Sequence, residues 1–398
     1  MSGAGGSWQL ARGVYDLLAD WRAGAGELRL PVWPGGPDWS QGHVVLTHSA
    51  RDAIKLAALS WGLRSGDEVL VPAYNCGCEI SPFTSMGVTV SLYRVTARAE
   101  IDIDDLLSRI RPRTRVVYVT HYFGAPAGGP ELVAACHARG VKIIEDCALS
   151  LFSAGVGSLG DATVFSLRKS LPAADGGLLI LRSDPLDPTG CAGPNWLAVA
   201  KGAASLVKNA LGVSFPRRGA GPKGQAEGPS LPDLPPAYYE TNPGRPRGGS
   251  RLAQGILACT DPASVLERRR SNYQALAEGL TDAPAVTLFW KDPLQAGVCP
   301  LGLPVLVRDK RTWCAALSSA GIPVPPWWEG CHRGLDWASF PEALTLKRHM
   351  LLLPVHQGLT SHDMTYVADV CRTLARRSDV NVSEGLRDDG VAGSVFPA

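Results

Sequence analysis

The segment VKIIEDCALSLFSAGVGSLGDATVFSLRKSLPAADGGLLILR, residues 141–182, contains three short apolar runs that predict β-strands. The first run, VKII, ends at Glu145 and Asp146. The second and third runs, ATVFSL and GLLILR, follow each other with no long helix pattern between them. Strands that read as continuous apolar runs are typical of sheets buried between layers of helices. This segment therefore predicts the centre of a sheet with both faces covered.

The chain upstream of this segment alternates between strand and helix patterns. Strands are predicted at 43–48, 68–73, 88–95 and 115–123, and helices at 50–63, 77–86, 103–110 and 130–140. Such alternation with uniformly apolar strands predicts an α/β fold with a mostly parallel sheet.

The remaining sequence divides into regions of different composition. Residues 1–42 read as an irregular arm with one helix around 8–21, and 43–250 as a large domain. Within it, 216–249 holds eight prolines and seven glycines, which predicts a long loop that is a candidate lid or linker. Residues 251–378 predict a smaller α+β domain, beginning with a helix from about residue 250 that continues through SVLERRRSNYQALAEGL; 379–398 predict a frayed tail.

Composition excludes several classes of protein. The chain has 398 residues, is 45% hydrophobic and carries a formal net charge of +2. A chain this apolar can bury a substantial core, so disorder throughout is not expected. The balanced charge argues against a strongly basic nucleic-acid binder. No apolar run reaches the roughly 18 residues that span a bilayer, and the first residues lack a secretory signal pattern. We therefore expect a cytoplasmic protein with neither a nucleic acid nor a membrane as partner.

The ten cysteines are scattered and include no C-x-x-C pair. Scattered cysteines without a secretory signal favour reduced thiols. Cys76 and Cys78 form the one close pair, and their spacing is poor for zinc, so no metal site is expected.

Three glycines, Gly155, Gly157 and Gly160, spell the G-x-G-x-x-G pattern of dinucleotide-binding loops. That function requires a strand before the glycines and a helix after them. Here the strand pattern DATVFSL follows, so the glycines predict a flexible turn rather than a nicotinamide site.

Three polar segments end or follow predicted strands, namely HSARDAI (48–54), IEDCALSL (144–151) and FSLRKSLPAADGG (165–177). Ligands of parallel sheets collect outside the carboxyl ends of the strands, so these segments can meet in one crevice. Ser49, Ala50 and Arg51 begin a helix, where free N–H groups and a cation suit a phosphate. Taken alone, an ordinary helix cap explains this first segment at least as well.

The other two segments carry a carboxylate and an amine. Asp146 leaves a buried strand, and a carboxylate there would keep a pyridoxal ring nitrogen protonated; the alternative is a helix or turn cap. Lys169 precedes the Gly176–Gly177 turn and could form a Schiff base with an aldehyde cofactor; the alternative is an ordinary solvated lysine.

The sequence resembles the DegT/DnrJ/StrS family of aminotransferases, from about residue 44 to 182 and more faintly to about 375. The stretches that carry the resemblance are GLRSGDEVLVPAYNC, THYFGAPAG, IEDCA, GSLGDATVFSLRK and DGGLL, in this order. The resemblance implies an aspartate-aminotransferase-like fold (fold type I), pyridoxal 5'-phosphate as cofactor, and a homodimer with a site built from two chains. It implies transfer of an amino group, by family habit from glutamate, to a keto sugar carried on a nucleotide or to a cyclitol.

The resemblance also implies roles for individual residues. Lys169 matches the lysine that forms the Schiff base, and Asp146 the partner of the pyridine nitrogen. Ser49, Ala50, Arg51 and Ser166 match the residues that bind the cofactor phosphate. His121 lies in the family's His-x-x-Gly segment, where a plain strand-end histidine is the alternative.

The sequence departs from the family pattern at several positions. Leu149 replaces a common His or Gln, and Cys76 stands where a ring often stacks on the cofactor, with Tyr74 as a possible substitute. Only Leu167 and Arg168 separate Ser166 from Lys169, where many members have four residues. GRPRGG replaces the usual Asn-x-Arg segment, so Arg245 or Arg247 could supply the missing charge across a dimer interface. Together with Arg217, Arg218 and Lys223, these arginines could also close the 216–249 loop over a diphosphate, unless the loop is a solvated linker.

Three other functions stay open at this point. A sugar dehydratase of the same fold would have a histidine in place of Lys169. A desulfurase would need a reactive cysteine on a loop, for which Cys331 is the candidate. The altered contacts at Cys76 and Leu149 would also suit a relative that has lost catalysis, although Asp146 and Lys169 are both retained.

Overall fold

The computed structural model describes residues 28–182, 191–210, 231–239 and 244–379. The helix predicted around 8–21, Arg217, Arg218, Lys223 and all but the first residue of the predicted tail lie outside these ranges.

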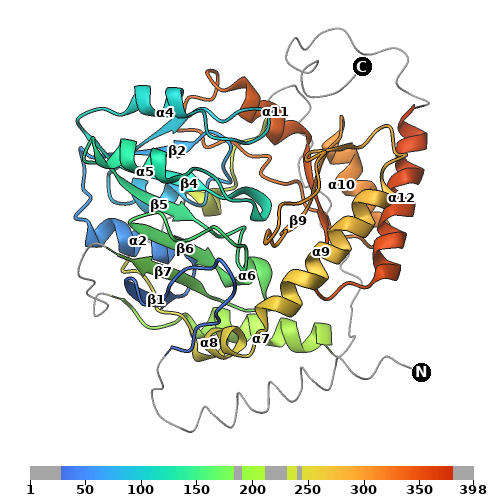
Figure 1. Cartoon of the computed structure of the whole chain (residues 1–398), viewed down its shortest axis with the longest axis horizontal. Coiled ribbons are helices and arrows are strands. Elements are labelled where there is room, and N and C mark those ends of the chain that lie inside the picture. The colour runs from blue at the N-terminus through green and yellow to red at the C-terminus, as the bar shows by residue number, and fades with distance from the viewer. Residues whose placement is uncertain (1–27, 183–190, 211–230, 240–243, 380–398) are drawn as a thin grey trace.

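A seven-stranded sheet forms the larger part of the molecule (Figure 1). Its spatial order is β1-β7-β6-β5-β4-β2-β3. The strands are β1 (His43–Thr47), β2 (Glu68–Pro72), β3 (Thr89–Tyr93), β4 (Thr114–Thr120), β5 (Lys142–Asp146), β6 (Ala162–Ser166) and β7 (Gly177–Leu181). β7 pairs antiparallel with both β1 and β6, whereas the pairs among β3, β2, β4, β5 and β6 are parallel. The prediction of a mostly parallel sheet is confirmed.

Both faces of the sheet are buried, as β7 illustrates. Leu179 and Leu181 point into a cluster that contains Ala53 and Ala57 of α2 (Ala50–Ser60). Leu178 and Ile180 point into a second cluster, on the side of α8 (Arg251–Ala258). Successive side chains of a strand face opposite sides, so a strand covered on both sides must be apolar throughout. The continuous apolar runs in the sequence have this origin.

Further helices connect the strands. They are α3 (Ile80–Thr84), α4 (Ile103–Arg109), α5 (Pro130–His137), α6 (Leu167–Ser170) and α7 (Trp196–Ala210), with the short 3₁₀ turns η1 (Tyr122–Gly124) and η3 (Pro236–Tyr238). Local signals mark their starts. Asp102 caps α4 by accepting a hydrogen bond from the Asp105 backbone N–H at 3.0 Å, and α5 begins with proline, whose missing N–H costs nothing in the first turn.

The rest of the chain surrounds a small antiparallel sheet of order β10-β9-β8. Its elements are α9 (Pro262–Gly279), β8 (Thr287–Leu288), β9 (Gly302–Leu306), α10 (Lys310–Ser319), α11 (Pro341–His349), β10 (Met350–Pro354) and α12 (Ser361–Asp379). α9 runs diagonally from α8 toward α12, against which it packs (Figure 1). Leu276, Leu303, Leu317 and Leu353 meet in this second core. The division into domains at about residue 250 stays a prediction.

One predicted helix is wrong as stated. The helix expected from about residue 250 to 280 is two helices, because α8 ends at Ala258 and α9 begins at Pro262. Asp261 caps α9 by accepting a hydrogen bond from the Ala263 backbone N–H at 3.0 Å. Proline disrupts the interior of a helix but suits its first turn, so Pro262 starts a new helix.

The G-x-G-x-x-G segment is a turn wrapped around a buried carboxylate. Glu145 accepts hydrogen bonds from the backbone N–H groups of Gly157, Leu159 and Gly160, at 3.2, 2.9 and 2.7 Å. Its Oε1 also lies 3.2 Å from Nε2 of His121. Burial alone would raise the pKa of Glu145, but these partners lower it below its ordinary value. The turn therefore encloses an internal anion, in agreement with the rejection of a dinucleotide site.

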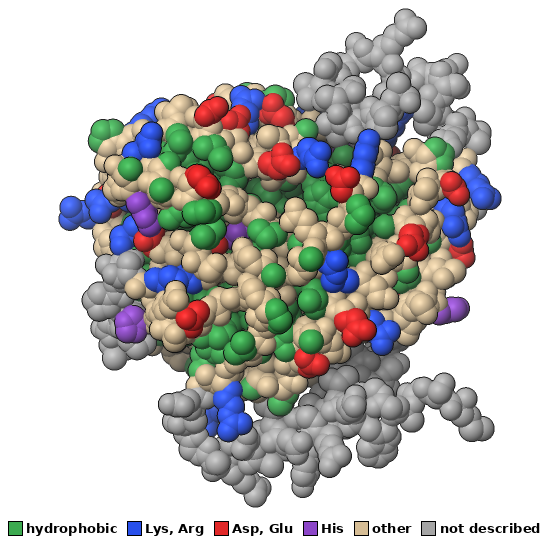
Figure 2. Space-filling view, in the orientation of Figure 1, with side chains coloured by type: hydrophobic (Ala, Val, Ile, Leu, Met, Phe, Trp, Pro, Cys, Tyr) green, Lys and Arg blue, Asp and Glu red, His purple; other side chains and the backbone are tan. Residues whose placement is uncertain are grey.

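Charges on the face shown in Figure 2 are mixed in sign. Among the described residues of that face, basic and acidic side chains are interspersed rather than gathered into one patch. None of the helices that the structure describes has the length and apolar character needed to cross a bilayer.

Candidate functional site

A cavity of about 890 Å³ lies at the carboxyl edge of the large sheet. Seven of the nine residues proposed from the sequence line it: Ser49, Ala50, Arg51, Cys76, Asp146, Ser166 and Lys169. Asp146 ends β5 and Ser166 ends β6, and these two strands are parallel, so both residues open onto the same edge. The strand-end rule brings together side chains that are up to 120 positions apart in the sequence.

The start of α2 forms one wall of the cavity. Ser49 is its N-cap, in extended conformation, and its hydroxyl accepts a hydrogen bond from the Asp52 backbone N–H at 3.3 Å. The first N–H groups of a helix have no partners within the helix, and its N-terminus favours negative charge. Arg51 adds a solvent-accessible cation beside them. This wall can bind a phosphate.

Gly177 allows this wall to approach the sheet. A Cβ atom on Gly177 would lie 2.4 Å from the backbone carbon of Ser49 and 2.6 Å from the backbone nitrogen of Ala50. Only glycine fits so close to another backbone, because every other residue carries that Cβ atom. The Gly-Gly turn noted in the sequence therefore has a defined task, namely to let the α2 N-terminus reach the edge of β7.

Asp146 and Lys169 supply the two charged groups of opposite sign. Asp146 is 8% exposed, and its Oδ1 accepts a hydrogen bond from the Ala148 backbone N–H at 2.9 Å. Lys169 lies in the short helix α6 directly after β6 and is accessible to solvent. A carboxylate held in a buried turn and a free amine on the same cavity wall are suited to proton transfer and to chemistry on a carbonyl group.

Arg269 holds the helix that carries the lysine. This arginine is 2% exposed, and its Nη2 donates to the Ser170 carbonyl oxygen at 3.1 Å. Nη1 donates to the carbonyl oxygens of Pro300 and Leu301 at 3.0 and 3.2 Å. Arg269 thus connects α9, α6 and the segment that immediately precedes β9. In the sequence it was one of three consecutive arginines, with nothing to single it out.

Residues 325–330, which the sequence indicated only as a loop, form another part of the cavity wall. Trp327 and Trp328 line the cavity and stack on each other, with ring centroids 5.3 Å apart. The buried Lys347 holds the loop by donating to the carbonyl oxygens of Asn75, Trp328 and Gly330, at 2.6, 3.3 and 2.9 Å. Burial lowers the pKa of Lys347 to about 8.

A second buried lysine, Lys310, donates to the Trp327 carbonyl oxygen at 2.9 Å and also to that of Lys347. Burial lowers its pKa to about 8 as well. These two lysines therefore fix the aromatic wall by satisfying its backbone carbonyls.

Residues 231–239, which belong to the predicted 216–249 loop, are docked across the cavity. Leu234 lies between Gly77 and Gly330, where Cβ atoms would approach its side chain to 2.1 and 2.6 Å. Its backbone N–H donates to the Cys331 carbonyl oxygen at 3.1 Å. Tyr238 of the same segment lines the cavity. This part of the loop forms a fixed wall.

Two of the nine proposed residues lie outside the cavity lining. Tyr74 is fully buried, and its ring contacts those of Tyr122 and Trp328, with centroids 5.4 and 5.1 Å away. His121 is fully buried beside Glu145, and its Nδ1 accepts a hydrogen bond from the Ala127 backbone N–H at 2.8 Å. Both residues stabilise the layer beneath the cavity in this structure.

The arginines proposed to replace the Asn-x-Arg segment, Arg245 and Arg247, are also absent from the lining residues. The backbone of Arg247 pairs with the start of α2, because its N–H donates to Oδ1 of Asp52 and its carbonyl oxygen accepts from the His48 N–H. Among the described residues, no group of three or more histidine, cysteine, aspartate or glutamate side chains is placed to hold a metal ion.

Comparisons with known proteins identify a family and several relatives that this chain resembles. Residues 39–190 match the model of the DegT/DnrJ/EryC1/StrS aminotransferase family. A UDP-N-acetyl-3-dehydro-alpha-D-glucosamine 3-aminotransferase of Acidithiobacillus ferrooxidans is 33% identical over 153 residues, which are 36% of this chain and 42% of that protein. The match thus spans about two fifths of that relative. The spore coat polysaccharide biosynthesis protein SpsC of Bacillus subtilis is 27% identical over 85% of this chain and 86% of its own length.

Solved structures confirm the fold. The pyridoxal-phosphate form of a putative sugar aminotransferase from Streptococcus pneumoniae, Spr1654, superposes with a TM-score of 0.65, covering 92% of this chain and 96% of that one at 17% identity. The predicted fold type I architecture and the family resemblance seen in the sequence are both confirmed.

Proposed function

We propose that this chain, whose residues 39–190 match the DegT/DnrJ/EryC1/StrS aminotransferase family, is a pyridoxal-phosphate-dependent aminotransferase. Its acceptor would be a ketone on a nucleotide-linked sugar or on a cyclitol. The observation that carries the proposal is the convergence of Lys169, Asp146 and the α2 N-terminus on one cavity. The relative from Acidithiobacillus ferrooxidans, whose name gives a nucleotide-linked amino sugar, supports this class of acceptor.

The residues present fit pyridoxal phosphate. The cavity of about 890 Å³ is within the usual range of ligand pockets, about 300–1,000 Å³. Ser49, Ala50 and Arg51 would bind the phosphate with Ser166, and Asp146 would face the ring nitrogen. Lys169 would hold the aldehyde carbon. When bound, this cofactor carries the amino group and accepts the electron pair that the substrate carbon releases on losing its proton.

The chain's own groups would perform three tasks. Asp146, fixed by the Ala148 N–H, would keep a proton on the ring nitrogen by presenting a negative charge in a nearly buried position. Lys169 would take the proton from the substrate carbon and return it at the next step, which needs an amine that is free to move. The aromatic wall of Trp327 and Trp328 would exclude water on the opposite side.

The amino donor, the oligomeric state and the compartment are part of the same proposal. Glutamate is the donor that the family resemblance favours, and a homodimer is the assembly that it favours. The ten cysteines carry unoxidised thiols in the structure, which supports a reducing compartment such as the cytoplasm.

The alternative functions are less well supported. A dehydratase of this fold would have a histidine where the cavity has Lys169. Cys331 does not suit a desulfurase, because burial raises the pKa of its thiol and its backbone is paired with residues 232–234. A relative without catalysis would have no need of both Asp146 and Lys169 on the cavity wall.

Reduction with borohydride tests the proposal directly. Purified protein loaded with pyridoxal phosphate should show a visible absorbance band, and reduction should attach the cofactor to the peptide that contains Lys169. Lys169→Ala should lose both signals. Lys201→Ala, which removes an exposed lysine of α7, is the matched control and should keep them. Attachment at another lysine, or an unchanged spectrum in Lys169→Ala, would refute the assignment.

Addition of amino acids then tests the reaction class. Glutamate should bleach the visible band, and a nucleotide-linked keto sugar should restore it. A band that no amino acid bleaches would leave cofactor binding in place and exclude transamination.

A further inference from the structure

Cys76 and Cys78 form a pair of thiols on the wall of the large cavity, on the turn between β2 and α3. Two residues of extended chain span about 7 Å, beyond the usual Cα separation in a disulfide, so the chain must bend to bring such cysteines together. Gly77 provides the bend with a φ of +85°, in the left-handed region. Leu234 packs against Gly77, where a Cβ atom would lie 2.1 Å from it, so the bend is held in place.

The surroundings give the two thiols different chemistry. Cys76 donates from its thiol to Oε2 of Glu79 at 3.0 Å, and its backbone N–H donates to Oε1 at 3.2 Å. Its contact with Cys78, assisted by burial, raises the pKa of Cys76 well above its ordinary value. The same contact lowers the pKa of Cys78; Arg51 and Lys169 act in the same direction and outweigh burial and Glu79, which oppose them. Cys78 is therefore the better nucleophile, since the thiolate is the reactive form.

The other eight cysteines have less favourable positions. Cys136, Cys147, Cys299, Cys314 and Cys371 are buried, and burial raises the pKa of each thiol. Burial also raises the pKa of Cys331. Cys191 and Cys259 are more accessible, but neither lines the cavity. The pair at 76 and 78 thus combines access, an adjacent thiol and nearby cations.

We propose that Cys76 and Cys78 are a reversible oxidation site, at which a hydroperoxide converts the two thiols into a disulfide. The Cys78 thiolate attacks one peroxide oxygen, which breaks the O–O bond and releases hydroxide (or alkoxide). The resulting sulfenic acid is attacked by the Cys76 sulfur, which loses its proton as the S–S bond forms and water leaves. Each disulfide consumes one hydroperoxide, and a small thiol reductant restores both thiols.

Formation of the disulfide would change the part of the cavity wall where Arg51 and Lys169 lie. The disulfide removes the hydrogen bond from Cys76 to Glu79 and the negative charge that Cys78 can present to the two cations. Without the negative charge of Cys78, the positive charges of Arg51 and Lys169 are offset less, so the cavity becomes more positive there. The proposal concerns the protein itself and does not depend on its being an aminotransferase.

Mass spectrometry of peroxide-treated protein tests the proposal without any cofactor. Trypsin releases residues 65–94 as one peptide, in which Cys76 and Cys78 are the only cysteines. After brief treatment with hydrogen peroxide, neither cysteine of this peptide should react with an alkylating reagent. The mass of the peptide should be lower than that of the reduced peptide by two hydrogen atoms. Dithiothreitol should restore both alkylation sites.

Single substitutions separate the two roles. In Cys76→Ser, the sulfenic acid on Cys78 should persist long enough for labelling with dimedone, whereas Cys78→Ser should give far less label on Cys76. Cys259→Ser is the matched control and should form the disulfide like wild type. The proposal is overturned if both cysteines of the wild-type peptide remain alkylatable after Cys259 has reacted, or if Cys78 appears only in disulfides between chains. The wild-type measurement decides the question even if a variant fails to fold.

Discussion

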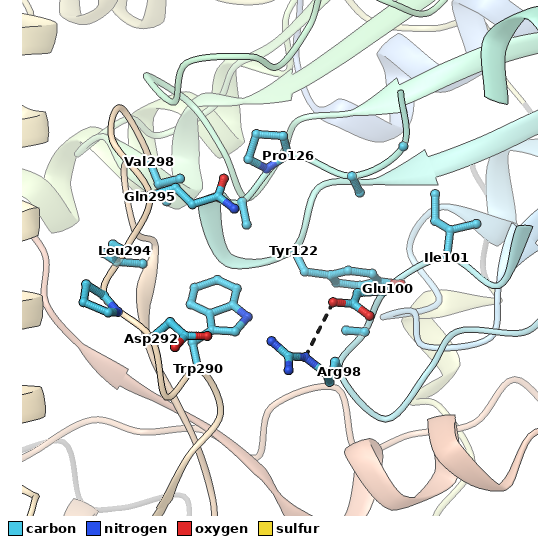
Figure 3. A pocket seen from close by; sticks show the side chains of 15 residues that line it. Arg98, Glu100, Ile101, Tyr122, Pro126, Trp290, Asp292, Leu294, Gln295 and Val298 are labelled. Carbon is cyan, nitrogen blue, oxygen red and sulfur yellow. Dashed lines mark ion pairs between the residues drawn. The ribbon is translucent and has the colours of Figure 1, made fainter. Parts of the chain in front are cut away.

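Two hollows in the described part of the chain differ in what lines them, although an aromatic cluster joins them. Phe123 lies between them, with its ring centroid 6.0 Å from that of Trp327 in the large cavity and 6.0 Å from that of Trp290 in a smaller pocket of about 300 Å³. Figure 3 shows the smaller pocket, with Trp290 and Asp292 facing Arg98 and Glu100.

Charged groups behave differently in the two places. In the smaller pocket Arg98 and Glu100 pair at 3.5 Å, with side chains 66% and 64% exposed, and such surface pairs contribute little energy. In the large cavity Asp146 is nearly buried, and Arg269, Lys347 and Lys310 hold its walls from below the surface. The candidate site therefore differs from the smaller pocket in the buried polar groups that hold its walls, and the presence of a hollow alone does not distinguish the two.

Among the variants considered, Lys169→Ala should reduce the rate of amino transfer the most. If the large cavity is the active site, the rate of amino transfer should fall by about three orders of magnitude, which is the usual worth of a positioned acid or base. The fold should be unaffected, because Lys169 is exposed and α6 is held through Ser170. Single-turnover formation of 2-oxoglutarate from glutamate, followed by chromatography, measures this effect in both proteins without relying on the visible band that Lys169→Ala should lose. A fall of less than tenfold would assign the proton transfer to another group.

Lys347→Met tests whether the aromatic wall depends on the buried lysine. The substitution leaves the carbonyl oxygens of Asn75, Trp328 and Gly330 without their donor, so we expect a loss of about 3 kcal/mol in the free energy of unfolding. Denaturant titration, with intrinsic tryptophan fluorescence as the signal, measures it. A variant as stable as wild type would mean that other donors reach these carbonyls.

The same variant gives a pH dependence of defined sign. The pKa of Lys347 is about 8 in the folded protein, against an ordinary 10.5, so between these values the unfolded chain binds more protons. Raising the pH through this window therefore stabilises wild type, and methionine has no such contribution. The stability gap between wild type and Lys347→Met should widen from about pH 8 to about pH 10. The charge of Lys347 contributes to the lowered pKa of Lys310, so the same comparison in a Lys310→Met background isolates the contribution of Lys347.

Gly177→Ala should have a smaller effect on stability and a selective one on the large cavity. The added Cβ atom meets the backbone of Ser49 at 2.4 Å, so the start of α2 must move, at a cost of about 2 kcal/mol. Affinity for pyridoxal phosphate should fall with it, because the displaced residues are the candidate phosphate site. Gly193→Ala is the matched control, since nothing lies within 4 Å of its Cβ position. If Gly177→Ala bound pyridoxal phosphate as tightly as wild type, Ser49 would not be part of the phosphate site.

The parts that sequence analysis predicted correctly depend on local patterns. The strands around Asp146 and Ser166 are apolar because they are covered on both faces, and the strand-end rule then places these residues in one crevice. The missed parts depend on contacts between distant residues. Lys347 bonds a carbonyl 272 positions away, and Arg269 one that is 99 positions away. No local pattern distinguishes such a lysine or arginine from a solvated one.

One error has a different origin. Asp261 and Pro262 carried the signals for a helix start, but the surrounding helical pattern concealed the break. His121 was proposed from its place in the family pattern, and Tyr74 as a substitute for the ring that is missing at Cys76; both roles stay predictions. In this structure their side chains pack beneath the cavity, beside the aromatic cluster and Glu145.

The smallest expected effect is in the other hollow. Asp292 and Gln295 line the smaller pocket and are exposed, so Asp292→Ala and Gln295→Ala should each change the free energy of unfolding by less than about 0.5 kcal/mol. Pyridoxal phosphate affinity and the glutamate half-reaction should stay within about twofold of wild type, since twofold corresponds to only about 0.4 kcal/mol. A larger loss of activity in either variant would show that the two hollows are coupled through Phe123. In that case exposed groups of the smaller pocket would also matter to the site, and the buried groups that hold the walls of the large cavity would not be sufficient to locate it.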